Sequence, residues 1–131
     1  MRKVKLGAGS VLVGAFLLAS GGTALAHSGS FSTISTTGVS FTGGYYAFAD
    51  NNTYDFRYSG TLNDTATDGN NVFVHGKVAG YGYGTRLYSP GYKSQYLNDP
   101  AATRVSTANV QACQDRGTAF SDLCSSRNFY H

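Results

Sequence analysis

An alternation of aromatic and polar side chains is the feature that most constrains how this chain can fold. It runs over residues 54–59, where the two kinds take turns: Tyr54, Asp55, Phe56, Arg57, Tyr58 and Ser59. Side chains two residues apart share one face of a β-strand, whereas a helix brings together residues three or four apart. The stretch therefore predicts a strand with one aromatic face and one polar face.

Further strands are predicted along the chain, with turn residues between them. Val72, Val74 and Val78 alternate with Phe73, His75 and Lys77, and this strand is expected to continue through residues 80–84 to Tyr88. Gly43 and Gly44 predict a turn between two short strands. Residues 104–114 predict a last core strand ending at Cys113, and residues 118–126 predict one short helical turn.

Composition supports an all-β fold. The chain has no Glu and no Trp, and Thr, Ser, Val, Tyr, Phe, Gly and Asn dominate it. These residue types suit pleated strands joined by tight turns. We therefore predict a small antiparallel β-sandwich or barrel of about six to eight strands.

The first 26 residues have the pattern of a signal peptide. A basic start at Arg2, Lys3 and Lys5 precedes an apolar run over residues 11–19, and the run ends before Ala24-Leu25-Ala26. This order, with a small-x-small cleavage site, is typical of export signals. The run is shorter than the roughly 20 residues that span a bilayer. We expect cleavage after Ala26, no membrane span in the mature protein, and a single secreted domain over residues 27–131.

The predicted mature domain is formally neutral. Seven basic residues remain in it and balance the seven acidic residues of the chain. Nucleic acid or an anionic membrane would require a concentrated basic patch, so neither is expected as a partner.

Cys113 and Cys124 are expected to form a disulfide. A disulfide is the default for two cysteines in an exported domain of this size. A zinc or redox pair fits less well, because the spacing is not Cys-x-x-Cys and no His neighbours either residue.

Three segments carry a resemblance to a known group of proteins: Gly60–Val72 with its Asp-Thr-x-x-Asp-Gly loop, Val110–Asp115 and Ser121–Ser125. With the signal peptide, they resemble small secreted proteins of unknown function from filamentous actinobacteria. The resemblance covers the chain from Tyr54 onward. It implies a secreted β-domain with a single disulfide, and it implies no catalytic residues.

Tyrosines provide the best sign of a binding surface. Five lie close together in the sequence: Tyr81, Tyr83, Tyr88, Tyr92 and Tyr96. Tyr81 and Tyr83 are predicted to share one face of a strand. Because burial is the commoner use of such rings, most of the five are expected in the core. The candidate binding surface is Tyr81, Tyr83, Tyr88 and Tyr92, which could stack on sugar rings or contact a partner protein.

The sequence contains two weak candidates for a metal site, and no cofactor is expected. Asp64 and Asp68 lie in a polar loop with a glycine, as in calcium loops, but the spacing does not match an EF-hand and a hairpin loop is the better interpretation. His27 would become the N-terminus after cleavage, where its amine and imidazole could bind Cu(II), with His75 as a second ligand. The third histidine, His131, is the last residue of the sequence. No sequence spacing links these three histidines.

An enzyme is not expected, because no motif of a nucleophile, metal hydrolase or paired carboxylates is present. The leading hypothesis is a non-enzymatic secreted domain that acts by surface contact with a cell-wall polysaccharide, a cell-surface component or another protein. The alternative is a bacteriocin-like toxin or a secreted enzyme inhibitor. The sequence does not define the oligomeric state.

Overall fold

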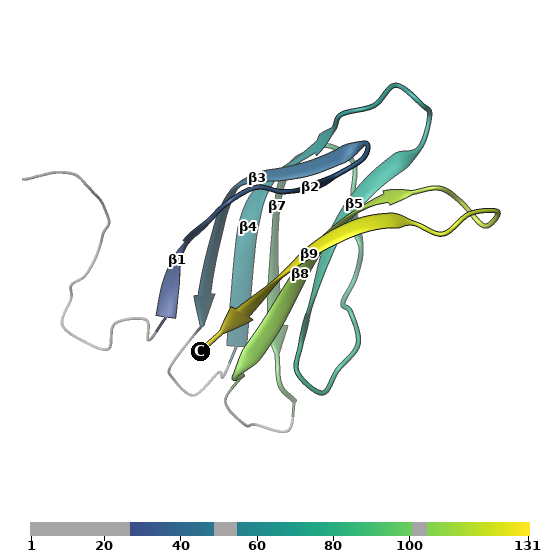
Figure 1. The fold of residues 1–131 in the computed structure, drawn as a ribbon. Helices are drawn as coiled ribbons and strands as arrows, with labels where there is room; N and C mark the ends of the chain where they lie inside the picture. Colours follow the sequence, from purple (N-terminus) through teal and green to yellow (C-terminus); the bar gives the residue numbers. More distant parts are fainter. Residues whose placement is uncertain (1–26, 49–54, 101–104) are drawn as a thin grey trace, which may run out of the picture.

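The computed structural model describes residues 27–48, 55–100 and 105–131, which form two antiparallel sheets packed face to face (Figure 1). The strands are β1 (His27–Phe31), β2 (Ile34–Thr36), β3 (Val39–Phe48), β4 (Asp55–Asp64), β5 (Asn71–Val78), β6 (Leu87–Tyr88), β7 (Gly91–Asn98), β8 (Thr107–Asp115) and β9 (Leu123–Tyr130). Sheet A has the order β1-β3-β4-β7, with β2 also paired to β3, and sheet B has the order β6-β5-β8-β9. The predicted signal peptide, residues 1–26, lies outside the described residues.

The predicted all-β fold with a disulfide between Cys113 and Cys124 is confirmed. The described residues form nine strands rather than six to eight, because β2 and β6 contain only three and two residues. None of the described residues belongs to a helix with the length and hydropathy of a membrane span.

The core lies between the two sheets. On β4 the predicted alternation is confirmed, since the even-numbered residues Phe56, Tyr58, Gly60 and Leu62 are buried. The residues between them, Arg57, Ser59 and Thr61, face outward. Sheet B contributes the inward side chains of β5 and β8, such as Val74 and Val110. Aromatic rings join the sheets: the centroids of Phe56 and Phe129, on β4 and β9, are 5.5 Å apart. Full burial of each large side chain contributes about 1.5–3 kcal/mol.

The two glycines predicted to form a turn instead form a β-bulge within β3. The ladder with β4 shifts register between Thr42 and Tyr45, so one extra residue is inserted there. Gly43 has φ = 62°, a left-handed conformation that glycine adopts without steric cost. A Cβ on Gly44 would overlap the ring of Phe31. The bulge changes the parity of the strand, so Tyr45 faces outward and the residue after it faces the core.

The strand predicted to run from Val72 to Tyr88 is interrupted by a reversal. β5 ends at Val78, and the N–H of Tyr81 donates to the Val78 carbonyl (3.1 Å). Gly80, with φ = 88°, supplies the left-handed residue of this turn. The chain then returns along β5 and pairs with it as β6. The prediction that Tyr81 and Tyr83 share one face of a strand is therefore wrong.

The end of the chain also differs from the prediction. Residues 118–126 form no helical turn, and β9 begins at Leu123 as an edge strand paired with β8. β8 is thus a core strand, as predicted, but not the last strand. Cross-strand pairing places Cys113 directly opposite Cys124, which accounts for the extended conformation around the second cysteine.

Candidate functional site

The outer face of sheet A carries three exposed tyrosine rings. Tyr45 on β3 is 42% exposed, and Tyr92 and Tyr96 on the edge strand β7 are 70% and 65% exposed. The last two are four residues apart on one strand, so they share a face. Arg57, from the polar side of β4, is paired in register with Tyr96. We call Tyr45, Arg57, Tyr92 and Tyr96 the tyrosine face.

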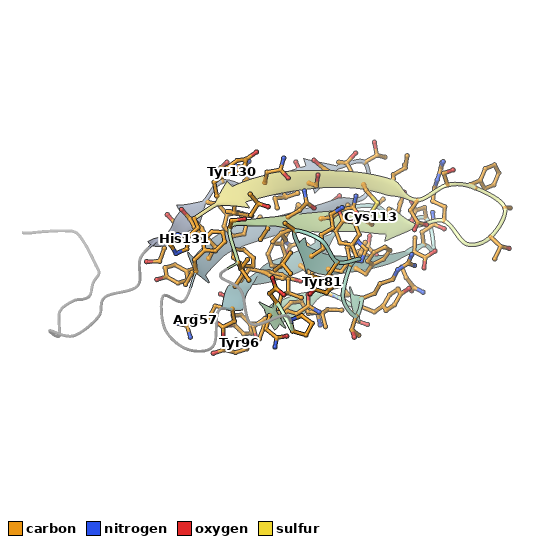
Figure 2. All side chains as sticks on the ribbon, turned by 90° about the horizontal axis from the view of Figure 1, so that it is seen from below. Arg57, Tyr81, Tyr96, Cys113, Tyr130 and His131 are labelled. Atoms are coloured by element: carbon orange, nitrogen blue, oxygen red, sulfur yellow. A yellow bond between two sulfur atoms is a disulfide. The ribbon has the colours of Figure 1, made fainter. Side chains whose placement is uncertain are left out.

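Arg57 and Tyr96 form the best-defined contact on this face. The guanidinium donates to the Tyr96 hydroxyl (3.0 Å), and its carbon lies 5.8 Å from the centre of the same ring. Figure 2 shows the two side chains together on one side of the molecule. A cation over an aromatic ring is attracted to its π face. The pair therefore holds the Tyr96 ring in a defined position at the surface.

The surroundings of the tyrosine face are rich in hydroxyl groups. Its central groove has a volume of about 240 Å³, and Ser59 and Ser94 line it beside the tyrosines. Further along the same strands, the Asn63 side-chain nitrogen donates to the hydroxyls of Ser40 and Thr42 (both 3.2 Å). A shallow groove of this kind cannot enclose a small molecule, but it can support a polymer lying across the sheet.

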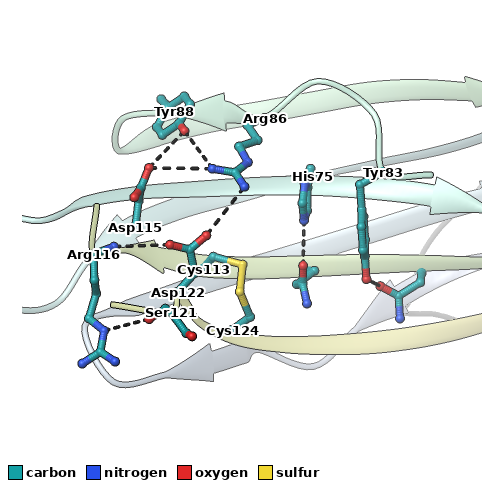
Figure 3. The surroundings of a disulfide bond; sticks show 12 residues. His75, Tyr83, Arg86, Tyr88, Cys113, Asp115, Arg116, Ser121, Asp122 and Cys124 are labelled. Carbon is teal, nitrogen blue, oxygen red and sulfur yellow. Dashed lines mark hydrogen bonds and ion pairs between the residues drawn. A yellow bond between two sulfur atoms is a disulfide. The ribbon is translucent and has the colours of Figure 1, made fainter. Parts of the chain in front are cut away.

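The outer face of sheet B is built differently, as a packed layer of rings and cations. Figure 3 shows His75, Tyr83 and Arg86 of this layer near the disulfide. The rings of His75 and Tyr83 are stacked, with centroids 4.0 Å apart and planes 6° apart. Phe73 meets His75 edge-on at 5.1 Å. Arg86 lies over Phe73 and Lys77 over Tyr83, at 4.3 Å and 4.8 Å from the ring centres. We call these five residues the stacked layer.

Hydrogen bonds fix this layer to β8. Nε2 of His75 donates to Oε1 of Gln111 (2.7 Å), and the Tyr83 hydroxyl donates to Oδ1 of Asn109 (2.7 Å). Burial raises the pKa of the Tyr83 hydroxyl. Arg86 is also 3.6 Å from a carboxylate oxygen of Asp122. Because the layer is packed and internally bonded, its principal role is to cover the outer face of β5.

His75 should make stability depend on pH. Burial, chiefly, lowers the pKa of His75 below its usual 6.5; the Gln111 hydrogen bond and Asp122 oppose this, while Arg86 and Lys77 add to it. The unfolded chain therefore binds a proton at a pH where the folded chain resists it. The contribution of neutral His75 to stability is therefore fully present above about pH 6.5, and it is lost as the pH is lowered through this value. We expect the melting temperature to drop between pH 7 and pH 5, and the drop to shrink in His75→Phe.

The pH range over which stability is lost distinguishes the effect of His75 from that of the carboxylates. The pKa of Asp68 is also lowered, chiefly by the hydrogen bond from the backbone N–H of Asn70. Protonation of such a carboxylate destabilises the protein only in more acidic solution, near pH 4 and below. An equal drop in melting temperature between pH 7 and pH 5 for wild type and His75→Phe would show that His75 is not responsible.

The structure separates the tyrosines of the predicted binding surface. Tyr92 belongs to the tyrosine face, whereas Tyr83 is part of the stacked layer. Tyr88 packs on Phe73 and its hydroxyl donates to Asp115 (3.1 Å), and the Tyr81 hydroxyl donates to Asp99 (2.8 Å).

The expectation that most of the five tyrosines are core residues is wrong. Tyr81, Tyr88, Tyr92 and Tyr96 are each at least 40% exposed. The core is filled instead by phenylalanines and valines of both sheets.

The candidate metal ligands are dispersed. Oδ1 of Asp64 accepts from the N–H of Ala66, and Oδ1 of Asp68 accepts from the N–H of Asn70, as expected for a hairpin loop. Gln114 also donates to Asp68. Among the described residues, no three His, Cys, Asp or Glu side chains are grouped so that they could hold a metal ion.

The three histidines lie at two places. His27 begins β1 opposite Phe48, and the His131 ring packs edge-on against the same phenylalanine at 5.4 Å. The side chain of His27 is not among those described. His75 is on the outer face of sheet B, in the stacked layer.

Three members of the tyrosine face, Tyr45, Arg57 and Tyr96, are absent from the predicted binding surface, although Tyr96 is one of the five tyrosines that cluster in the sequence. The alternation over residues 54–59 does place Arg57 on the polar face of its strand, but nothing in the sequence shows that β7 lies beside β4. Tyr45 faces outward only because of the bulge at Gly43 and Gly44.

Comparisons of the chain with protein-family models, with curated proteins and with solved structures give no match. Function must therefore be argued from the surfaces themselves, because a β-sandwich by itself supports many activities.

Proposed function

We propose that this protein is a non-catalytic binding domain for polysaccharide, of the kind found in cell walls, and that it binds through the tyrosine face. The observation that carries the proposal is the grouping of three exposed tyrosine rings with Arg57 on one sheet. An exposed aromatic ring leaves apolar surface in contact with water, and clusters of such rings mark interaction surfaces. A tyrosine offers a flat apolar ring to the C–H face of a sugar and a hydroxyl to its oxygens.

The residues around the rings suit the same ligand. Serine, threonine and asparagine side chains donate and accept hydrogen bonds, as sugar hydroxyls do. Arg57 retains further N–H groups beyond the one that it directs at Tyr96. The shallow groove allows a chain to cross the sheet without ending there.

Secretion belongs to the same proposal. The disulfide between Cys113 and Cys124 supports an oxidising compartment, where such bonds persist. A polysaccharide of the cell surface would be available to a protein in that place.

The test is retention of the purified protein on insoluble chitin, cellulose, bacterial cell walls and an acidic polysaccharide resin. We expect retention on at least one of these. Tyr92→Ala and Tyr96→Ala should each weaken binding about tenfold, corresponding to about 1.4 kcal/mol, as truncation of an aromatic anchor does at other interfaces.

Phe120→Ala is the matched control, because Phe120 is also 65% exposed but lies in the loop between β8 and β9. It should bind as wild type does. If no polysaccharide retains the wild type, or if the tyrosine variants bind unchanged, the proposal is wrong. The toxin or inhibitor hypothesis would then be tested next.

A further inference from the structure

A second groove lies on the opposite side of the molecule, at one end of the outer face of sheet B. Its volume is about 200 Å³, and the polar side chains that line it are Lys77, Thr107, Asn109, Asn128 and Tyr130. Tyr130, near the end of β9, is 66% exposed.

Its polar groups are held in place by hydrogen bonds. The Tyr83 hydroxyl donates to Oδ1 of Asn109, and Nδ2 of Asn109 donates to Oδ1 of Asn128 (2.8 Å). The second bond turns the amide nitrogen of Asn128, an exposed residue, away from Asn109. Lys77 is positioned over the Tyr83 ring. The groove therefore presents an amide donor, an ammonium group and an exposed tyrosine.

The two grooves share their chemistry. Each combines an exposed tyrosine with hydroxyl and amide groups and one cation placed over a tyrosine ring: Arg57 over Tyr96 in the first, Lys77 over Tyr83 in the second. Among the described residues that line the two grooves, none carries a carboxylate. A groove whose lining holds a cation and no acid complements a negatively charged ligand.

The grooves face in opposite directions. Tyr96 lies on the outer face of sheet A and Tyr130 on the outer face of sheet B, and the core fills the space between the sheets. Figure 2 shows Tyr130 on the other side of the molecule from Arg57 and Tyr96. Backbones of stacked sheets are about 10 Å apart, so a straight chain bound in one groove does not reach the other.

We propose that the domain is bivalent: each groove binds a segment of an acidic polysaccharide, with a sugar on the tyrosine and a carboxylate at the cation, so that one domain bridges two chains. This proposal rests on the proposed function and adds both a ligand class and a second site. Bivalence raises avidity on a surface that carries many chains, without any new contact.

The experiment uses soluble alginate, in which every sugar carries a carboxylate, and methylcellulose as the neutral probe. Retention on immobilised alginate measures binding, and light scattering of protein mixed with soluble alginate measures bridging. Wild type should be retained and should raise the scattering, and added salt should reduce both.

Tyr130→Ala and Lys77→Gln should still be retained through the tyrosine face, but should lose the rise in scattering. Lys77→Arg preserves the charge and should keep it. Phe120→Ala is again the control, with both readouts as in wild type. Melting temperatures of all variants show whether each is folded.

Three results would overturn the proposal in different ways. If Tyr130→Ala and Lys77→Gln bridge alginate as well as the wild type does, the second groove is not a binding site. A dimer that binds through one tyrosine face per subunit would also give this result. Equal bridging of methylcellulose would exclude the acidic ligand. Failure of the wild type to bind any polysaccharide would overturn the proposed function and the bivalence with it.

Discussion

Phe56→Ala should lower the free energy of unfolding by about 3–5 kcal/mol, the range found for loss of a buried phenylalanine. Phe56 is fully buried on β4. Its ring lies 4.8 Å from that of Phe48, on the neighbouring strand of its own sheet, and 5.5 Å from that of Phe129, across the core in sheet B. Truncation would leave a cavity between the sheets, and the rings around it are held by strands that cannot close it.

Chemical denaturation measures this loss, and Ser59→Ala on the outward side of the same strand is the control. Outward substitutions of this kind usually change stability by less than about 0.5 kcal/mol. Because small domains are stable by only about 5–15 kcal/mol, this loss is a large share of the total, and Phe56→Ala should unfold at a clearly lower denaturant concentration than wild type. A change below about 1 kcal/mol would mean that the two sheets do not meet at Phe56 as described.

The sequence predicts well what depends on the two-residue period. The faces of β4 and the inward valines of β5 follow from alternation alone, because a buried face requires apolar residues at every second position. The pairing of the cysteines follows from composition and expected compartment. The strand faces depend only on neighbouring residues, and two cysteines allow only one intramolecular pairing.

The predictions failed where a glycine altered the path of the chain. Gly43 and Gly44 produce a bulge, and Gly80 produces a reversal. The same residue type suits a turn, a bulge or a strand, because it adopts both signs of φ at little cost. Only the pairing of the neighbouring strands decides between them. The reversal at Gly80 removes the predicted shared face of Tyr81 and Tyr83, and the bulge turns Tyr45 outward, so both features affect the binding surface.

The candidate site could not be assembled from the sequence for a related reason. Tyr45, Arg57 and Tyr96 come from three strands, and their grouping on one face depends on the order β3-β4-β7 and on its register. A shift of one residue would turn each side chain to the other face. The spacing of Tyr92 and Tyr96 indicates a shared face, but not whether that face is buried.

Replacing both cysteines, as Cys113→Ala with Cys124→Ala, should lower the free energy of unfolding by about 3 kcal/mol and leave the strands in place. The bond joins residues eleven apart. In the chain-entropy model, a loop of this size lowers the conformational entropy of the unfolded chain, which raises its free energy by about that amount. Alanine is used because Cys113 is fully buried, where a serine hydroxyl would need a partner. For a domain of this size the melting temperature should fall by roughly 12–24 °C.

Reduction of the wild type should reproduce the effect, since it removes the same constraint without changing a side chain. The loss should be greatest in β9, an edge strand whose only ladder partner among the described strands is β8. Pairing from Thr107–Tyr130 to Gln114–Leu123 brackets the disulfide on both sides, so the ladder should survive its removal. Amide hydrogen exchange should therefore accelerate in β9 before it does in β4. Equal melting temperatures for the oxidised and reduced protein would show that the ladder and the packing of Phe129, rather than the disulfide, hold β9 in place.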